Sequence, residues 1–200
     1  ALRATMEGCE AVIHTAAKAG IWGPWETYAS VNVEGTRGVI AAARLTGVRY
    51  LVHTSTPSVV YGPRQFEGED ESLPYGVRIP CAYAATKVEA ERLALAAHEP
   101  GKLAICALRP HLIWGPGDPH LVPRLLERAR AGRLRIIGDG RNRVDLTHVE
   151  NAAQAHLDAL RALERGSAGG RAYFISDGAP VALWPWLNGV LELAGLPPLS

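Results

Sequence analysis

Hydrophobic and polar positions along the 200-residue chain form two alternating kinds of segment. Short apolar runs, which are typical of buried strands in a parallel sheet, are followed by longer amphipathic segments, which are typical of helices. The expected strands are 11–15, 49–54, 103–108, 134–138 and 172–176, and the expected helices are 1–7, 25–46, 80–98, 121–131, 150–163 and 181–194. This alternation predicts an α/β fold, in which a doubly wound parallel sheet is covered by helices on both faces.

The longest predicted helix runs from Trp25 to Thr46, between Gly23-Pro24 and Gly47. Proline is favoured at the start of a helix and glycine just past its end, so both boundaries have a physical reason. Asn32 lies near the apolar stripe of this helix, and its amide either bonds to backbone inside the protein or supports a site. We expect the apolar stripe to be buried. By the period of a helix, it consists of Tyr28, Val31, Gly35, Val39 and Ala42.

Tyr83 and Lys87 are the first candidate catalytic residues. They lie four residues apart in the predicted helix 80–98, and Pro80 is a residue that favours the start of a helix. Residues at this spacing lie on the same face of a helix. A phenol has a pKa of about 10, and a nearby ammonium group can lower it by roughly 1–3 units. Such a tyrosine can exchange a proton with a carbonyl or hydroxyl oxygen. Taken alone, the spacing also fits two partly exposed helix residues without a shared role.

Distinctive residues follow three of the predicted strands. Small residues occupy 16–20 after the first strand, hydroxyl groups occupy Ser55-Thr56-Pro57-Ser58 after the second, and Arg109-Pro110 and a Gly/Pro-rich loop follow the third. Ligands of open α/β sheets bind at the carboxyl ends of the strands. Each pattern alone also occurs in ordinary turns. Their combination at one sheet edge, together with the Tyr83 helix, indicates a ligand site, whereas His14 alone is more typical of a packed strand residue.

Composition narrows the function further. A formal net charge of +1 gives no reason to expect nucleic acid or an anionic membrane as a partner. No apolar run approaches the roughly 18 residues of a membrane span. Three scattered cysteines form neither a metal-binding cluster nor a disulfide framework, so we expect no metal and a cytoplasmic location. Arginines 124, 128 and 130 on the helix 121–131 are typical of a solvated face.

The chain begins Ala1-Leu2-Arg3, so we expect a longer parent protein.

The motifs together resemble the extended short-chain dehydrogenase/reductase family, and within it the 3β-hydroxysteroid dehydrogenase/isomerase branch. Residues 16–23 and 109–120 are most similar to bacterial members of the 2-alkyl-3-oxoalkanoate reductase type. The matching motifs, in the order of the family, are Val12-Ile13-His14-Thr15-Ala16-Ala17, Asn32-Val33-Glu34-Gly35-Thr36, Thr54-Ser55-Thr56, Tyr83-Ala84-Ala85-Thr86-Lys87, Leu108-Arg109-Pro110 and Gly115-Pro116-Gly117-Asp118.

The resemblance implies NAD or NADP as cofactor and assigns roles to individual positions. It implies that Tyr83 is the catalytic acid/base, that Lys87 holds the nicotinamide ribose and lowers the tyrosine pKa, and that Thr56 bonds to the reacting oxygen. The residues implied to contact the cofactor are His14, Ala16, Ala17, Lys18, Thr54, Ser55, Tyr83, Lys87, Pro110 and His111. The residues implied to contact the substrate are Ser58, Trp114 and Arg143.

The sequence departs from the family pattern at its start. The glycine-rich turn that follows the first strand of the family is not present, nor is the residue that separates NAD from NADP. We therefore expect about two βα units before this chain. By the resemblance, residues 1–117 and 143–180 form the remaining part of a dinucleotide-binding domain, and residues 118–142 and 181–200 form a substrate-binding part.

These implications favour an enzyme that interconverts a secondary alcohol and a ketone on a small hydrophobic substrate, steroid-like or 3-oxoacyl-like. Tryptophans 22, 25, 114, 184 and 186 favour an apolar substrate. One alternative is an NDP-sugar epimerase or dehydratase of the same fold. Another is a non-enzymatic dinucleotide-binding protein, against which the presence of Tyr83 counts. We also expect a homodimer that packs through the helices 25–46 and 80–98.

Overall fold

The computed structural model describes residues 1–20, 22–62, 66–76, 79, 81–119 and 121–199. The chain divides into two compact units. The first unit comprises residues 1–110 and 154–175, and the second comprises residues 111–153 and 176–200. The domain boundaries expected from the resemblance fall after residues 117, 142 and 180, whereas the two compact units divide after residues 110, 153 and 175. The expected domains and the roles assigned to them stay predictions.

The first unit is built on a four-stranded sheet in the order β1-β2-β3-β7. All neighbouring strands are parallel, and their register aligns the carboxyl ends, with His14 opposite His53 and Thr54 opposite Leu108. This alignment gathers the segments that follow β1, β2 and β3 at one edge, as the sequence predicted. The strands are β1 Ala11–His14, β2 Tyr50–Thr54, β3 Ala104–Pro110 and β7 Ala172–Ile175.

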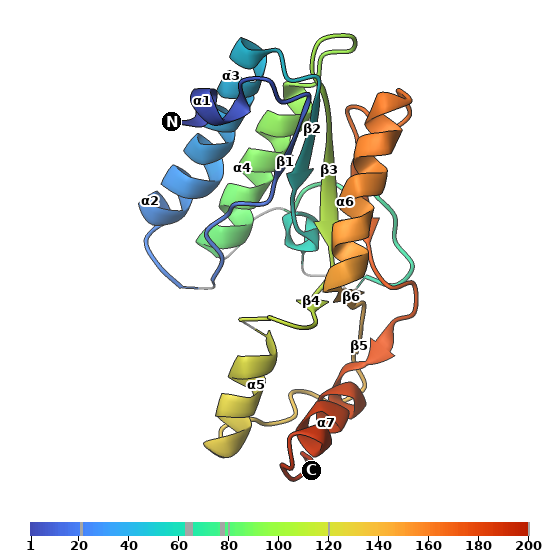
Figure 1. The fold of residues 1–200 in the computed structure, drawn as a ribbon. Coiled ribbons are helices and arrows are strands. Elements are labelled where there is room, and N and C mark those ends of the chain that lie inside the picture. The colour runs from blue at the N-terminus through green and yellow to red at the C-terminus, as the bar shows by residue number, and fades with distance from the viewer. Residues whose placement is uncertain (21, 63–65, 77–78, 80, 120, 200) are drawn as a thin grey trace. The chain divides into compact units, whose positions relative to one another are not determined.

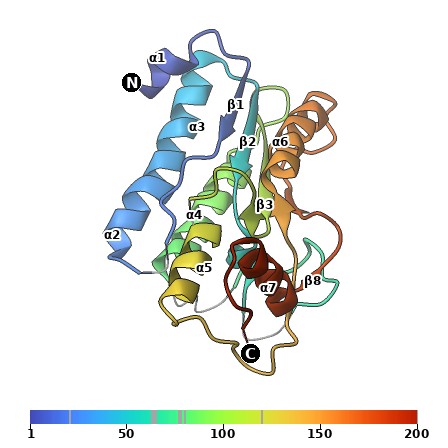
Figure 2. The same cartoon turned by 60° about the horizontal axis from the view of Figure 1, so that its bottom comes forward.

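Helices cover both faces of this sheet (Figure 1). On one face lie α1 Leu2–Met6, α3 Gly35–Thr46 and α4 Ala82–Ala96, which form an apolar cluster with β2 and β3. On the other face, α6 Val149–Glu164 packs on β2, β3 and β7. Figure 2 shows α3 beside α4 and the sheet between α4 and α6 from a second direction. The predicted doubly wound parallel sheet is confirmed.

The long helix of the first unit contains a π-helical segment. It consists of α2 Trp25–Tyr28, a π-helix at Ala29–Glu34, and α3, and it ends at Gly47 with φ 75°, as predicted. A π-helix bonds each residue to the fifth along the chain and therefore rotates the following side chains relative to an α-helix. Asn32 and Val33 are buried as a result, and Val31 is 42% exposed. The predicted buried stripe is therefore wrong at Val31.

The second unit contains two small sheets and two helices. β4 Ile113–Trp114 pairs in parallel with β6 Thr147–His148, and β5 Arg143–Val144 pairs antiparallel with β8 Val181–Ala182. The helices are α5 Leu121–Arg130 and α7 Leu183–Leu193. Their core contains Leu125, Trp184, Leu187 and Leu191.

Three local predictions differ from the structure. The strand expected at 134–138 does not form, because Leu134 and Ile136 bury their side chains against the α5 and α7 core instead of joining a ladder. The helix expected at 181–194 begins two residues later, since residues 181–182 form β8. Pro80, the predicted start of the helix that bears Tyr83, lies outside the described residues, and Cys81 is the N-cap of α4. None of the helices formed by described residues has the length and apolar character needed to cross a bilayer.

Candidate active site

Helix α4 and the segment after β2 bring Tyr83, Lys87 and Thr56 together within the first unit. The Tyr83 hydroxyl shares a hydrogen bond with the Thr56 side chain. The Lys87 Nζ donates to the Thr54 carbonyl oxygen at 2.7 Å. Both members of the helical pair therefore contact the hydroxyl-rich segment 54–58, which is the arrangement that the sequence motifs indicated.

Thr56 is held in place by a short 3₁₀-helix, Pro57–Val60, of which it is the N-cap. Its Oγ1 accepts from the Ser58 backbone N–H at 3.3 Å and lies 3.1 Å from the Ser58 Oγ. Such a cap fixes the hydroxyl relative to the backbone. The neighbouring Ser55 donates its N–H to the Leu108 carbonyl at 2.6 Å, and its buried Oγ has no hydrogen-bond partner among the described residues.

Lys87 is buried, and its amine contacts two neighbouring groups. Besides the Thr54 carbonyl, its Nζ contacts the His53 Nε2 at 3.4 Å. Burial lowers the pKa of Lys87 to about 8, against the opposing effect of the Glu91 carboxylate. An ammonium group has three donors. Within the described part of the chain, the third finds no acceptor, so it is available to a ligand.

The pKa of the Tyr83 phenol is raised, not lowered. Burial is the largest cause, the hydrogen bond to Thr56 acts in the opposite direction, and Cys81 adds to the rise. The expected lowering by Lys87 is therefore wrong for this structure, because removing the phenolate from water outweighs the favourable effects around it. At neutral pH the phenol consequently holds its proton.

Two buried histidines lie behind Lys87. His14 and His53 are opposite each other in the β1–β2 register, and their ring centroids are 5.3 Å apart. Burial, followed by the charge of Lys87, lowers the pKa of His14 to about 4 and that of His53 well below its usual value. The His14 Nε2 lies 3.0 Å from the Thr36 Oγ1. His14 is thus packed inside, while its contact with a cofactor stays a prediction.

Asn32 joins the small-residue loop to the helix that bears Tyr83. Its Oδ1 accepts from the Lys18 N–H at 2.7 Å, and its Nδ2 donates to the Lys18 carbonyl at 3.1 Å and to the Thr86 Oγ1 at 3.0 Å. The side chain therefore satisfies backbone groups and also fixes Lys18 relative to α4. Ala16, Ala17 and Lys18 are exposed, which leaves this strand end open to a ligand.

Two residues that the sequence analysis did not single out belong to this neighbourhood. Glu91 follows Lys87 by four residues and forms a buried ion pair with Arg109 of β3. Repeating the four-residue step from Tyr83 to Lys87 once more could have found it. His53 could have been found from its position directly before Thr54 in β2.

The buried ammonium group of Lys87 should make stability depend on pH in the alkaline range. Its pKa is about 8 in the folded chain, compared with 10.5 for an ordinary lysine. Between these values the unfolded chain binds more protons, so the free energy of unfolding rises with pH. Relative to Lys87→Met, we expect the wild type to gain up to about 3 kcal/mol from pH 8 to pH 10.5, measured by urea unfolding.

The control for this experiment is Lys102→Met. Lys102 forms an exposed ion pair with Glu99, and its side chain is 76% exposed. Its removal should leave the pH dependence of unfolding unchanged. A difference between wild type and Lys87→Met that stays constant over the same pH range would contradict the lowered pKa of Lys87.

The remaining predicted site residues lie at the end of β3 and in the second unit. Pro110 ends β3 opposite Ile175, and the pKa of the next residue, His111, is lowered by burial, against the effect of Asp145. Trp114 makes edge-to-face contacts with His148 and Trp186, at centroid distances of 5.2 and 5.4 Å. Arg143 donates to the Pro180 carbonyl oxygen.

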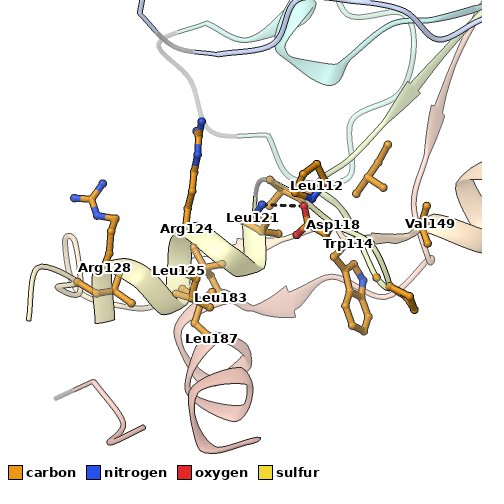
Figure 3. Close-up of a pocket in the computed structure, with 16 residues that line it drawn as sticks. Leu112, Trp114, Asp118, Leu121, Arg124, Leu125, Arg128, Val149, Leu183 and Leu187 are labelled. Carbon is orange, nitrogen blue, oxygen red and sulfur yellow. Dashed lines mark hydrogen bonds between the residues drawn. The ribbon is translucent and has the colours of Figure 1, made fainter. Parts of the chain in front are cut away.

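A cavity of about 780 Å³ lies within the second unit (Figure 3). Trp114 lines it, whereas Arg143 is not among its lining residues. Its walls are mainly apolar and include Leu112, Leu125, Val149 and Leu187. Among the residues that the structure describes, no group of three or more His, Cys, Asp or Glu side chains could hold a metal ion.

The sheet of the first unit and the residues at its carboxyl edge define a Rossmann-type α/β protein. Residues 1–198 match the model of the 3-beta hydroxysteroid dehydrogenase/isomerase family, and the chain belongs to this family. The family resemblance inferred from the motifs is thereby confirmed.

Two curated relatives are 2-alkyl-3-oxoalkanoate reductases. The chain is 52% identical over 194 residues to that of Stenotrophomonas maltophilia (strain K279a), with 95% of this chain and 58% of the relative covered. It is 44% identical over 209 residues to that of Shewanella oneidensis, with 100% of this chain and 54% of the relative covered. The chain thus spans somewhat more than half the length of these relatives.

A similar solved structure is that of MoeE5 in complex with UDP-glucuronic acid and NAD. The two chains are 32% identical and superpose with a TM-score of 0.80, over 98% of this chain and 66% of MoeE5. This likeness supports the Rossmann-type assignment of the fold.

Proposed function

We propose that the protein is an NAD(P)-dependent oxidoreductase that interconverts a secondary alcohol and a ketone on a small hydrophobic substrate. The observation that carries this proposal is the Tyr83 phenol hydrogen-bonded to Thr56, on a helix that also places Lys87 beside the same strand end. The names of the two curated relatives, which are reductases of 3-oxo acids with alkyl chains, support the same reaction class.

The residues at this sheet edge fit the nicotinamide–ribose end of a dinucleotide. Lys87 has one donor left for a ribose hydroxyl, and the Ser55 Oγ is a buried polar atom without a partner among the described residues. The exposed segment 16–18 carries little side-chain bulk, so a flat ring can approach its backbone. Pro110 and His111 are proposed to lie beside the ring. When bound, the cofactor supplies or accepts the hydride.

In this proposal, side chains of the protein transfer the proton that accompanies the hydride. The Tyr83 phenol, which holds its proton at neutral pH, donates it to the carbonyl oxygen of the substrate during reduction. Thr56 binds the same oxygen and fixes its position. The Lys87 ammonium, still charged at neutral pH with a pKa of about 8, is held at the same strand end by the Thr54 carbonyl oxygen.

An NDP-sugar epimerase or dehydratase is the second candidate, because MoeE5 was solved with a UDP-sugar and NAD. The names of the two curated relatives, which are 2-alkyl-3-oxoalkanoate reductases, favour a hydrophobic substrate over a sugar. A non-enzymatic role is disfavoured, because the tyrosine, lysine and threonine are all present and in contact with one strand end.

A substrate screen separates these functions. The complete protein is incubated with NADH or NADPH and either long-chain 3-oxo compounds or UDP-sugars, and the absorbance of the reduced nicotinamide is followed. We expect oxidation of the reduced cofactor with the 3-oxo compounds and no reaction with the sugars. Conversion of a UDP-sugar without net consumption of reduced cofactor would replace our proposal with the epimerase or dehydratase function.

We further propose a cytoplasmic homodimer that packs through α2, the following π-helix and α4. The support for this interface is the apolar exposure on that helix, where Trp25 and Val31 are 40% and 42% exposed. Such partly exposed large side chains are common in protein interfaces.

A further inference from the structure

The ammonium group of Lys87 lies between two acceptors at the end of β2. Its Nζ donates to the Thr54 carbonyl oxygen at 2.7 Å and lies 3.4 Å from the His53 Nε2. His53 and Lys87 are 1% and 2% exposed, so bulk water does not compete for these contacts. Any residue at position 54 would provide a carbonyl oxygen, whereas the second acceptor exists only because residue 53 is a histidine. The orientation of the ammonium group therefore depends on the His53 side chain.

The contact with Lys87 determines which nitrogen of His53 carries the proton. An ammonium group can only donate, so the His53 Nε2 must offer its lone pair. The ring is neutral, because burial and then the charge of Lys87 lower the pKa of His53 well below its usual value. In a neutral imidazole with an accepting Nε2, the Nδ1 carries the hydrogen. This Nδ1 is buried and has no hydrogen-bond partner among the described residues.

Packing alone does not explain a histidine at this position. A buried N–H without an acceptor is unfavourable, and a leucine at position 53 would fill the interior without such a group. Among the residues that the structure describes, the polar partner of the His53 ring is Lys87. The ring therefore has a buried, unsatisfied donor on one side and, on the other, an acceptor directed at the candidate active site.

A second histidine restricts the ring of His53. The His14 ring lies beside it, with centroids 5.3 Å apart and an interplanar angle of 48°. His14 is itself anchored, since its Nε2 lies 3.0 Å from the Thr36 Oγ1. The Thr36 hydroxyl donates its hydrogen to the Asn32 carbonyl at 2.7 Å, so it accepts from the His14 Nε2–H. The acceptor offered to Lys87 is thus held by a packed and hydrogen-bonded neighbour.

We propose that His53 is a positioning residue, which orients the Lys87 ammonium so that its third N–H meets a ribose hydroxyl of the dinucleotide. The three N–H bonds of an ammonium group have fixed angles between them, so two acceptors that hold two of the bonds also direct the third. The inference rests on the proposed function, because it assumes that a nicotinamide cofactor occupies this sheet edge. It assigns to His53 an effect on cofactor affinity that acts through Lys87.

Two amide substitutions test whether the His53 Nε2 is needed as an acceptor. The Oε1 of glutamine is as many bonds from Cβ as the Nε2 of histidine, whereas the Oδ1 of asparagine is one bond closer. We expect His53→Asn to weaken the binding of NADH or NADPH by about 5- to 30-fold, and His53→Gln to stay within about twofold of the wild type. Isothermal titration calorimetry on the complete protein measures these affinities.

A matched control removes a histidine acceptor from the opposite end of the same sheet. The His98 Nδ1 accepts from the Ile105 N–H at 3.1 Å, near the start of β3. His98→Leu should therefore lower the free energy of unfolding and leave cofactor affinity unchanged. ADP lacks the nicotinamide ribose, so it should bind to His53→Asn and to the wild type with equal affinity. Circular dichroism shows that each titrated variant is folded.

The outcomes separate this inference from the proposed function. Unchanged affinity in His53→Asn, equal weakening by the glutamine and asparagine variants, or a similar loss in His98→Leu would overturn the role of His53. A parallel loss of ADP affinity would also overturn it, because the effect would then not come from the ribose contact. In each of these cases the wild type still binds the cofactor and the oxidoreductase proposal stands. A wild type that binds neither NADH nor NADPH would overturn both.

Discussion

Replacing Tyr83 with phenylalanine in the complete protein should lower turnover by about 10²–10⁴ while cofactor affinity changes little. The substitution removes the proposed proton donor and keeps the aromatic ring in place. The contacts of Lys87 with Thr54 and His53 do not involve the phenol oxygen, so the expected ribose contact survives. Steady-state turnover and a separate titration of NADH or NADPH measure the two quantities.

Tyr173→Phe is the matched control for this prediction. Tyr173 lies in β7, and its hydroxyl donates to the Ala168 carbonyl at 3.4 Å. Its removal deletes one phenol oxygen from the same unit without touching the Tyr83 site, so turnover should stay within about twofold of the wild type. Turnover of Tyr83→Phe that is close to normal would remove Tyr83 from the reaction and, with it, the proposed mechanism.

Local sequence patterns were sufficient to predict the parallel sheet and to predict that the candidate site residues lie together at its carboxyl edge. Each strand of the four-stranded sheet is an apolar run with a clear boundary, and a parallel sheet places the ends of all such runs at one edge. Gly47 ends the long helix for a backbone reason that is visible in the sequence. The positions of Tyr83, Lys87 and Thr56 follow from the same reasoning, because a helix and a strand end are both local features.

Features that depend on contacts between distant segments could not be predicted in this way. The period of an α-helix pointed Val31 inward, but a π-helix turns Asn32 inward, where its amide bonds with the Lys18 backbone and Thr86. The raised pKa of Tyr83 results from burial, which depends on the packed fold. The missing strand at 134–138 has the same origin, since side-chain packing in the second unit determines the conformation of that segment.

The second prediction with a large expected effect concerns the stability of the fold and the buried ion pair of Glu91 and Arg109. The Arg109 Nε and Nη2 donate to the two oxygens of Glu91 at 3.0 and 2.6 Å, and the Tyr75 hydroxyl donates to the same carboxylate at 2.9 Å. The Arg109 guanidinium carbon also lies 5.3 Å from the ring centroid of Phe174. The side chains of Arg109 and Glu91 are 4% and 0% exposed. Neither charge can turn to water if the other is removed.

We therefore expect Glu91→Ala to lower the free energy of unfolding by about 3–5 kcal/mol, because it leaves a buried guanidinium group without its carboxylate. Urea denaturation at neutral pH measures this loss. Glu91→Gln keeps the shape and one acceptor, so it should lose less and remains measurable if the alanine variant fails to fold. Removing the carboxylate should also lower the pKa of Lys87 further, since Glu91 opposes the effect of burial there.

Two controls separate the pair from general damage to α4. Glu89 is exposed on the same helix, and Glu89→Ala should change the free energy of unfolding by no more than about 0.5 kcal/mol. The double variant Glu91→Leu/Arg109→Met replaces both charges with apolar side chains and should recover much of the loss, because no charge then remains buried alone. If the double variant were as unstable as Glu91→Ala, the loss would come from packing around α4 and not from an unpaired charge.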